Sequence, residues 1–78
     1  MNKHSHIPLS PVVSSQVSGI GYDAGTKTLA VSFNSGSTYH YHDVPVEKFE
    51  AIAKAESVGQ YLGKHIKPFH PFQKLNQT

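Results

Sequence analysis

The chain has 78 residues, with seven lysines, no arginine, five acidic residues, six histidines and no cysteine. A chain of this length forms one small domain that buries only about 60% of its unfolded surface, so its core is thin. The absence of cysteine excludes disulfides, thiolate catalysis and zinc sites of the finger type. The formal charge of +2 permits an anionic partner without requiring one. The absence of arginine, the side chain best suited to bidentate phosphate and base contacts, weakens the case for nucleic acid.

Residues 1–14 are expected to form an extended arm, because Pro8 and Pro11 lie among scattered serine and histidine. The arm contains no apolar stretch of the signal-peptide type. No apolar stretch in the chain approaches the roughly 20 residues that a membrane-spanning helix needs. A cytoplasmic location is therefore expected.

Regular structure is predicted to begin near Ser15, with a strand over residues 16–22. The two faces of this strand are expected to carry Ile20 and Tyr22 on one side, and Val17, Gly19 and Gly21 on the other. Residues 23–26 have the composition of a turn. A second strand over residues 28–34 shows the cleanest alternation in the chain. Its two faces carry Leu29, Val31 and Phe33 on one side, and Thr28, Ala30 and Ser32 on the other.

A third strand begins after residues 34–36, whose order suits a three-residue hairpin loop with Gly36 in the left-handed position. Such a loop pairs Leu29 with Tyr41, whereas a two-residue turn would exchange the faces of the third strand. We prefer the three-residue loop because it places the tyrosines of the Tyr-His-Tyr-His segment, and not its imidazoles, beside leucine and valine.

The segment after Pro45 changes to helical spacing, with apolar residues at positions 46, 49, 52 and 53. This helix is expected to cover the tyrosine face of the sheet. Ser57 and Gln60 have capping-box spacing, which predicts a short second helix that ends at Gly63. The fold class is therefore α+β, with a three-stranded antiparallel β-meander followed by one packed helix and a short second helix. Residues 15–70 form the domain, and residues 71–78 form a C-terminal tail.

A series of short motifs occurs in a fixed order along the domain. They are Ser14-Ser15, Gly21-Tyr22-Asp23, Lys27-Thr28-Leu29, Phe33 through Gly36, Tyr39-His40-Tyr41, Val44-Pro45, and Ser57 through Tyr61 with His65-Ile66. Together they resemble the KTSC domain family, which occurs at the C-terminus of some lysyl-tRNA synthetases and as a free-standing small protein. The resemblance implies a compact α+β domain, and the synthetase context suggests RNA binding. Gly63 stands where the family often has a polar residue, so a role for that residue is not carried over.

The motif tyrosines Tyr39, Tyr41 and Tyr61 are expected to belong to the core. Rings on a strand also serve as stacking platforms for unpaired bases, which is the alternative for Tyr39 and Tyr41.

His40 and His42 share a face of the third strand and are expected to face solvent. Two imidazoles at this spacing begin a metal site, but its third ligand would have to come from elsewhere, so no metal is predicted. The candidates for that ligand are His4, His6, His65, His70 or a second subunit. The face that carries His40 and His42 is otherwise rich in glycine and small residues. It is expected to receive the chain's own arm or tail, a second copy, or another partner.

The segment near the C-terminus mixes cations with two phenylalanines, a pattern that suits single-stranded nucleic acid or a nucleotide. A solvated tail with its rings packed on the core would have the same composition. The candidate ligand-binding residues are His40, His42, Lys64, His65, Lys67, Phe69, His70, Phe72 and Lys74.

No enzyme activity and no cofactor are predicted. The chain has no nucleophile elbow, zinc-protease motif or phosphate-binding loop. His42 and Asp43 are neighbours on a strand and therefore point to opposite faces. The expected function is a small non-enzymatic module that binds RNA or another nucleic acid or nucleotide. The alternative is a protein–protein or self-association module that uses the open sheet face or a strand edge.

Overall fold

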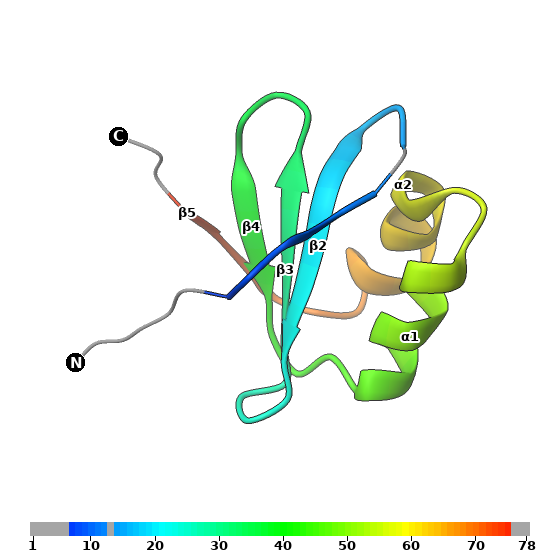
Figure 1. Cartoon of the computed structure of the whole chain (residues 1–78). Coiled ribbons are helices and arrows are strands. Elements are labelled where there is room, and N and C mark those ends of the chain that lie inside the picture. The colour runs from blue at the N-terminus through cyan, green and yellow to red at the C-terminus, as the bar shows by residue number, and fades with distance from the viewer. Residues whose placement is uncertain (1–6, 13, 76–78) are drawn as a thin grey trace.

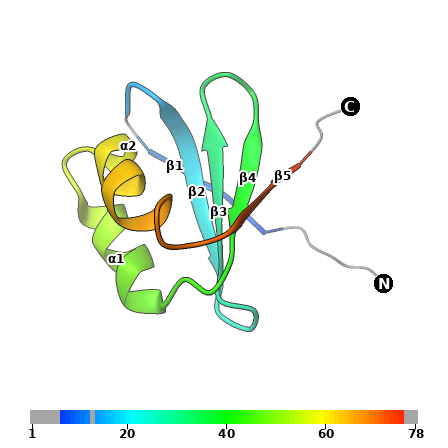
Figure 2. The same ribbon diagram turned by 180° about the vertical axis from the view of Figure 1, so that it is seen from behind.

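The computed structural model describes residues 7–12 and 14–75, which form one antiparallel sheet with helices on one face (Figures 1 and 2). The elements in chain order are β1 (Ser10–Pro11), β2 (Val17–Asp23), β3 (Thr28–Phe33), β4 (Thr38–Tyr41), α1 (Val46–Lys54), α2 (Val58–Tyr61), η1 (Leu62–Ile66) and β5 (Phe72–Leu75). The α+β class is confirmed, but the sheet has five strands in the order β1-β2-β3-β4-β5, and not three. The two added strands come from the predicted arm and the predicted tail.

The β3–β4 hairpin has the predicted register. Leu29 pairs with Tyr41, and the Phe33 amide donates to the Ser37 carbonyl at 2.8 Å. Gly36 has a φ of 98°, a conformation that glycine adopts without strain. Tyr41 is consequently buried on the core face, as expected, and Tyr39 lies half-buried beside it.

Strand β2 contains a bulge that sequence alternation did not reveal. Val17 pairs with Phe33, but Gly19 pairs with Ser32, so the register shifts between Val17 and Gly19. An extra residue in one strand exchanges its faces at that point. Val17 therefore lies fully buried in the core, and its predicted position beside the glycines is wrong.

The glycine face of β2 is covered by the chain's own arm. A side-chain carbon on Gly21 would lie 2.1 Å from the Pro8 carbonyl oxygen, and one on Gly19 would lie 3.2 Å from that of Ser10. The arm backbone approaches this closely because neither residue has a side chain. Of the occupants considered for this face, the arm is the one observed over the two glycines. His40, on the same face, is only 8% exposed, so the expectation that it faces solvent is wrong.

The helices cover the other face of the sheet and complete the core. On α1, Phe49 stacks on Tyr22 with ring centroids 5.1 Å apart, and the Tyr22 hydroxyl donates to the Val44 carbonyl. The most deeply buried apolar residues come from every layer and are Val17, Ile20, Leu29, Val31, Tyr41, Val44, Ile52, Val58, Leu62 and Ile66. No helix in the described ranges has the length and apolarity needed to cross a membrane.

The second helical segment is longer than predicted. Ser57 caps it as expected, because its hydroxyl accepts from the Gln60 amide at 3.3 Å. The helix does not end at Gly63. It continues as a π-helix in which the Lys67 amide donates to the Leu62 carbonyl at 2.9 Å. Leu62 and Ile66, four residues apart on one face of this segment, are both almost completely buried in the core.

Candidate functional site

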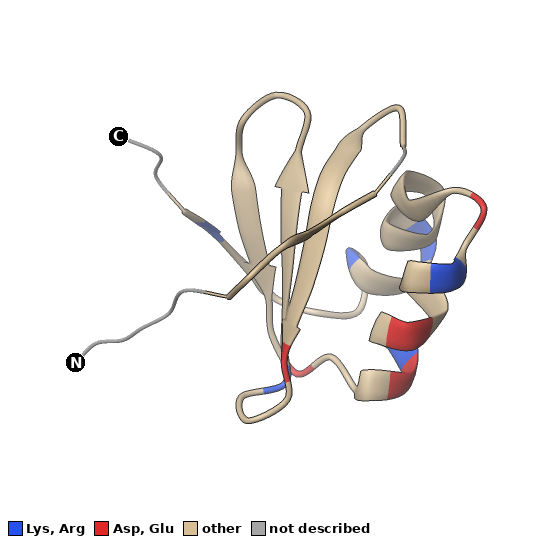
Figure 3. Cartoon of the chain, viewed as in Figure 1, with Lys and Arg blue, Asp and Glu red and all other residues tan. Residues whose placement is uncertain are grey.

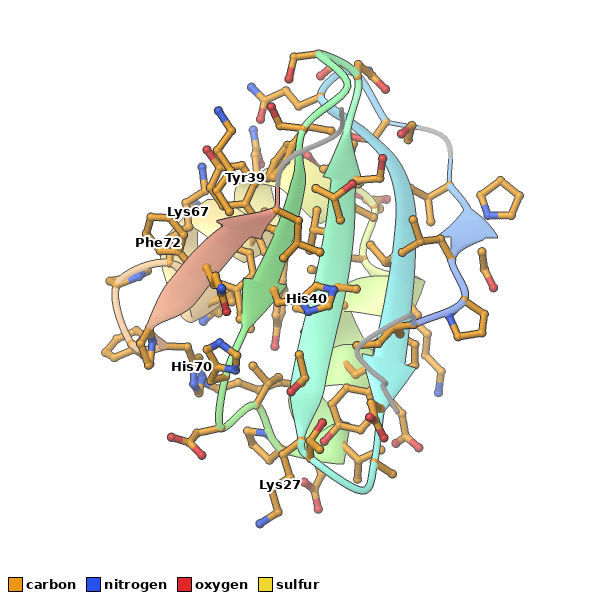
Figure 4. The ribbon with its side chains drawn as sticks, turned by 90° about the vertical axis from the view of Figure 1, so that its left-hand side faces the viewer. Lys27, Tyr39, His40, Lys67, His70 and Phe72 are labelled. Atoms are coloured by element: carbon orange, nitrogen blue, oxygen red, sulfur yellow. The ribbon has the colours of Figure 1, made fainter. Side chains whose placement is uncertain are left out.

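A cavity of about 580 Å³ lies on the core face of the sheet, beside rings of β3, β4 and β5. We call it the aromatic pocket. It is lined by Ser15, Gln16, Phe33, Asn34, Ser35, Ser37, Tyr39, Tyr41, Lys67 and Phe72. Figure 4 shows Tyr39, Lys67 and Phe72 gathered on one side of the sheet, with the His40 ring apart from them.

Four rings form the apolar wall of this pocket. Tyr39 is central, with its ring centroid 5.2 Å from that of Phe33, 5.2 Å from that of Phe72 and 6.2 Å from that of Tyr41. Phe72 joins the group because β5 pairs with β4 and places it opposite Tyr41. More than half of the Phe72 side chain is exposed. The wall therefore presents ring surface to a ligand.

The pocket is cationic at its rim. The Lys67 ammonium, at the end of η1, lies 5.6 Å from the centroid of the Phe33 ring, a cation–π contact. Lys74 lies directly opposite Tyr39 in the register of β4 and β5, so its side chain starts on the same face. No aspartate or glutamate lines the pocket. The acidic residues lie on α1, in the loop after it and at the opposite end of the sheet from the β3–β4 hairpin (Figure 3).

Tyr41 is the one pocket residue that is both polar and almost completely buried, with 1% of its surface exposed. Its hydroxyl has no hydrogen bond to another residue in the described ranges. Burial, and secondarily the nearby Tyr39 phenol, raises the pKa of Tyr41 to about 12, so the phenol stays protonated near neutral pH. Tyr41 therefore contributes a neutral phenol to the pocket floor.

A second polar cluster anchors the start of β5. His70 Nδ1 lies 3.2 Å from the His42 carbonyl oxygen, and His70 Nε2 lies 3.1 Å from the Lys48 ammonium. A carbonyl only accepts and an ammonium only donates, so these partners assign a neutral His70 with its proton on Nδ1. The Lys48 ammonium also donates to the His65 carbonyl at 3.0 Å. The His42 amide donates to the Pro71 carbonyl at 2.9 Å, which leads directly into β5.

The structure separates the residues proposed from sequence into several groups. Lys67 and Phe72 line the aromatic pocket, and Lys74 lies opposite the pocket residue Tyr39 without being one of the lining residues, whereas His70 belongs to the cluster with Lys48. The Phe69 ring is two-thirds exposed, and its centroid lies 5.1 Å from the Lys48 ammonium.

The other proposed residues lie outside the pocket. The His65 ring packs on the half-buried Tyr61 ring at 4.4 Å, and Lys64 is exposed on η1. His40 is buried on the opposite face, where burial, and secondarily His42, lowers its pKa. Within the described ranges no three metal-ligating side chains come together, and His4 and His6 lie outside those ranges.

Sequence reasoning missed several residues of the site. Phe33 lies on the core face, as predicted, but its position at the end of β3 also makes it a lining residue of the pocket. Gln16 and Asn34 come from loops. The sequence predicted Asn34 in the β3–β4 hairpin loop and Gln16 at the start of a strand, but it singled out neither as a site residue. Lys48 lies on α1 and meets His70 only through tertiary packing.

Comparisons with known proteins agree on a single family. Residues 13–70 match the model of the KTSC domain. A KTSC domain protein from Yersinia pestis, solved by crystallography, superimposes with a TM-score of 0.84 at 30% identity, covering 91% of this chain and 100% of that one. An uncharacterized protein from Stutzerimonas stutzeri is 39% identical over 57 residues, which are 73% of this chain and 80% of that protein.

A larger relative contains a similar region as a small part of its length. The lysine–tRNA ligase of Nostoc punctiforme is 36% identical over 69 residues, which are 88% of this chain but only 12% of the ligase. The order of the motifs, the five-stranded sheet and these similarities lead to one conclusion: the chain belongs to the KTSC domain family.

Proposed function

We propose that this domain is a non-enzymatic module that binds single-stranded RNA through the aromatic pocket. The observation that carries the proposal is the pocket's composition: four rings, a lysine against one of them, and no carboxylate among the lining residues. Stacking of an unpaired base on such rings contributes about 1–3 kcal/mol per base. Similarity to part of a lysine–tRNA ligase also supports an RNA ligand.

The roles of the pocket residues follow from their exposure and charge. An unstacked base lies against the exposed Phe72 ring and the Tyr39 ring beside it. The ammonium groups of Lys67 and Lys74 lie near the backbone phosphates. The buried Tyr41 hydroxyl donates to an acceptor atom of the base or ribose. None of these roles requires a metal or an organic cofactor.

A fluorescence-anisotropy titration with a labelled single-stranded RNA of about six nucleotides tests the proposal. Phe72→Ala is expected to weaken binding about tenfold, because it removes a stacking surface. Phe69→Ala is the matched control, since Phe69 is also an exposed phenylalanine near the C-terminus but lies outside the pocket. Equal effects of the two substitutions would argue against a role for the pocket.

Salt dependence gives a second measure of the same proposal. With two lysines at phosphates, raising the salt from about 50 to 200 mM is expected to weaken binding about sevenfold. Replacing Lys67 with methionine is expected to reduce this salt dependence. No measurable binding of the wild-type domain to any single-stranded RNA would reject the proposal.

The second candidate function is association with a protein or with another copy of the chain. The observation that favours it is the position of β5, which ends the sheet and leaves one backbone edge without a neighbouring strand in the described structure. This candidate predicts a mass that rises with protein concentration, measured by sedimentation, and that changes little with salt.

A further inference from the structure

A second cavity of about 260 Å³ adjoins the aromatic pocket. We call it the polar pocket. It is lined by Ser15, Gln16, Ser57, Gly59 and Gln60. Ser15 and Gln16 line both cavities, so the two form neighbouring compartments of one site. One compartment offers rings and a cation, and the other offers hydroxyl and amide groups without charge.

Gln16 lies at the junction with a fixed backbone. The backbone carbonyl of Gln16 accepts from the backbone amide of Asn34 at 2.8 Å. The backbone amide nitrogen of Gln16 lies 3.3 Å from the Ser14 hydroxyl. The Asn34 side chain donates to the Ser15 carbonyl at 3.0 Å. These bonds tie the loop before β2 to the β3–β4 hairpin, and so the base of the Gln16 side chain is held in place.

Two of the polar groups beside Gln16 are already used in hydrogen bonds, whereas its own side-chain amide is not. The Ser57 hydroxyl caps α2, and the side-chain amide of Asn34 donates to a backbone carbonyl. The Gln16 amide has no hydrogen bond with a residue in the described ranges. It lies close to α2, since a side-chain carbon on Gly59 would lie 2.9 Å from Gln16 Oε1. Gly59 therefore leaves room for this amide.

We propose that Gln16 is a specificity-determining residue that reads the edge of the nucleobase next to the one stacked in the aromatic pocket. A carboxamide offers one donor and one acceptor side by side, and it pairs in two-bond fashion with adenine. Because adenine is the usual two-bond partner of a carboxamide, the ligand class that we propose is single-stranded RNA with adenine at the position beside the stacked base. This inference rests on the proposed function and adds base selectivity to it.

The test measures the affinities of four short single-stranded RNAs, each made of one kind of base, for the wild-type domain and for variants. The wild-type domain is expected to bind the adenine oligonucleotide most tightly. The preference is the ratio of the affinity for the adenine oligonucleotide to that for the weakest ligand. Gln16→Ala is expected to reduce this ratio about tenfold, because an amide–base pair contributes discrimination of that order. Its affinity for the weakest ligand is expected to stay unchanged, since the rings and lysines remain.

Two further variants make the test specific. Gln16→Glu replaces the donor–acceptor pair by two acceptors, so it is expected to shift the preference toward guanine, which presents two adjacent donors. Gly59→Ala is expected to displace the flexible end of Gln16 and to reduce the adenine preference without unfolding the domain. Gln73→Ala is the matched control, because Gln73 pairs with His40 on the opposite face of the sheet.

The outcomes distinguish this inference from the proposed function. If no oligonucleotide binds the wild-type domain, both are rejected. If the oligonucleotides bind with equal affinity, or adenine is not preferred, Gln16 does not read a base as proposed, while RNA binding stands. An adenine preference that survives Gln16→Ala also overturns the inference. Thermal melting of each variant confirms that the changes in preference come from folded protein.

Discussion

The ammonium of Lys48 lies 3.1 Å from Nε2 of His70, and this contact joins helix α1 to the segment that begins β5. The other end of the ring bonds to the His42 carbonyl, on the loop after β4. The end of β4 and the start of α1 thus meet, at one imidazole, a segment that lies 22 to 28 residues later in the chain, and the start of β5, with its pocket residue Phe72, depends on these contacts.

Replacing Lys48 with methionine is therefore expected to destabilise the domain by about 1 kcal/mol, because it leaves the His65 carbonyl and the His70 ring without their donor. Urea denaturation measures this change. The amide of His42, which is bonded to Pro71, is expected to exchange its hydrogen faster. Lys54→Met on the same helix is the control, since that side chain is exposed. Equal effects of the two substitutions would contradict the anchoring role.

Acid is expected to destabilise the domain through His40. Burial, and secondarily the charge of His42, lowers the pKa of His40 below its ordinary value of 6.5, so the unfolded chain takes up this proton first. The contribution of His40 to stability is complete above pH 6.5, the ordinary pKa of histidine. It is lost as the pH falls from there through the lowered pKa of His40 in the folded domain. His40→Gln is expected to flatten this part of the profile, measured as the free energy of unfolding against pH. The control is His65→Gln, at an exposed site. This variant is expected to keep the decrease in the free energy of unfolding that His40 causes as the pH falls.

Gly21→Ala is expected to detach the arm from the sheet. The added carbon would lie 2.1 Å from the Pro8 carbonyl oxygen, a backbone atom that cannot simply rotate away. The expected loss of stability is about 1–3 kcal/mol, the range for overpacking. Proton NMR is expected to show altered shifts for residues 7–11. Gly63→Ala is the control, because nothing lies within 4 Å of its added carbon. Unchanged arm resonances in the Gly21 variant would refute the packing argument.

Tyr41→Phe separates stability from binding. The ring packs in the core, but its hydroxyl has no partner in the described ranges, so removing the oxygen is expected to preserve stability or raise it by about 1 kcal/mol. RNA binding is expected to weaken, because the pocket floor loses its donor. Tyr41→Ala, in contrast, is expected to cost about 3–5 kcal/mol, as for other buried aromatic residues. A clear loss of stability in the phenylalanine variant would show that the hydroxyl is already bonded.

The local elements could be predicted from sequence because their signals lie within a few residues. Alternation over residues 28–34 and a glycine at position 36 were sufficient to predict the hairpin register, and hence the core face of Tyr41. Helical spacing after Pro45 was sufficient to predict α1. In each case the chemistry of neighbouring residues determines the backbone, and burial only selects which face turns inward.

Tertiary structure decided the rest, because the site joins segments that share no local signal. The bulge at residues 17–19 turned Val17 into the core, and it depends on pairing with β3. The arm covers Gly19 and Gly21 because a partner backbone reaches them. Phe72 meets Tyr41 because β5 pairs with β4 after the helical segment ends. Such contacts form when distant backbone groups satisfy each other's hydrogen bonds and bury apolar surface, and no short stretch of sequence encodes them.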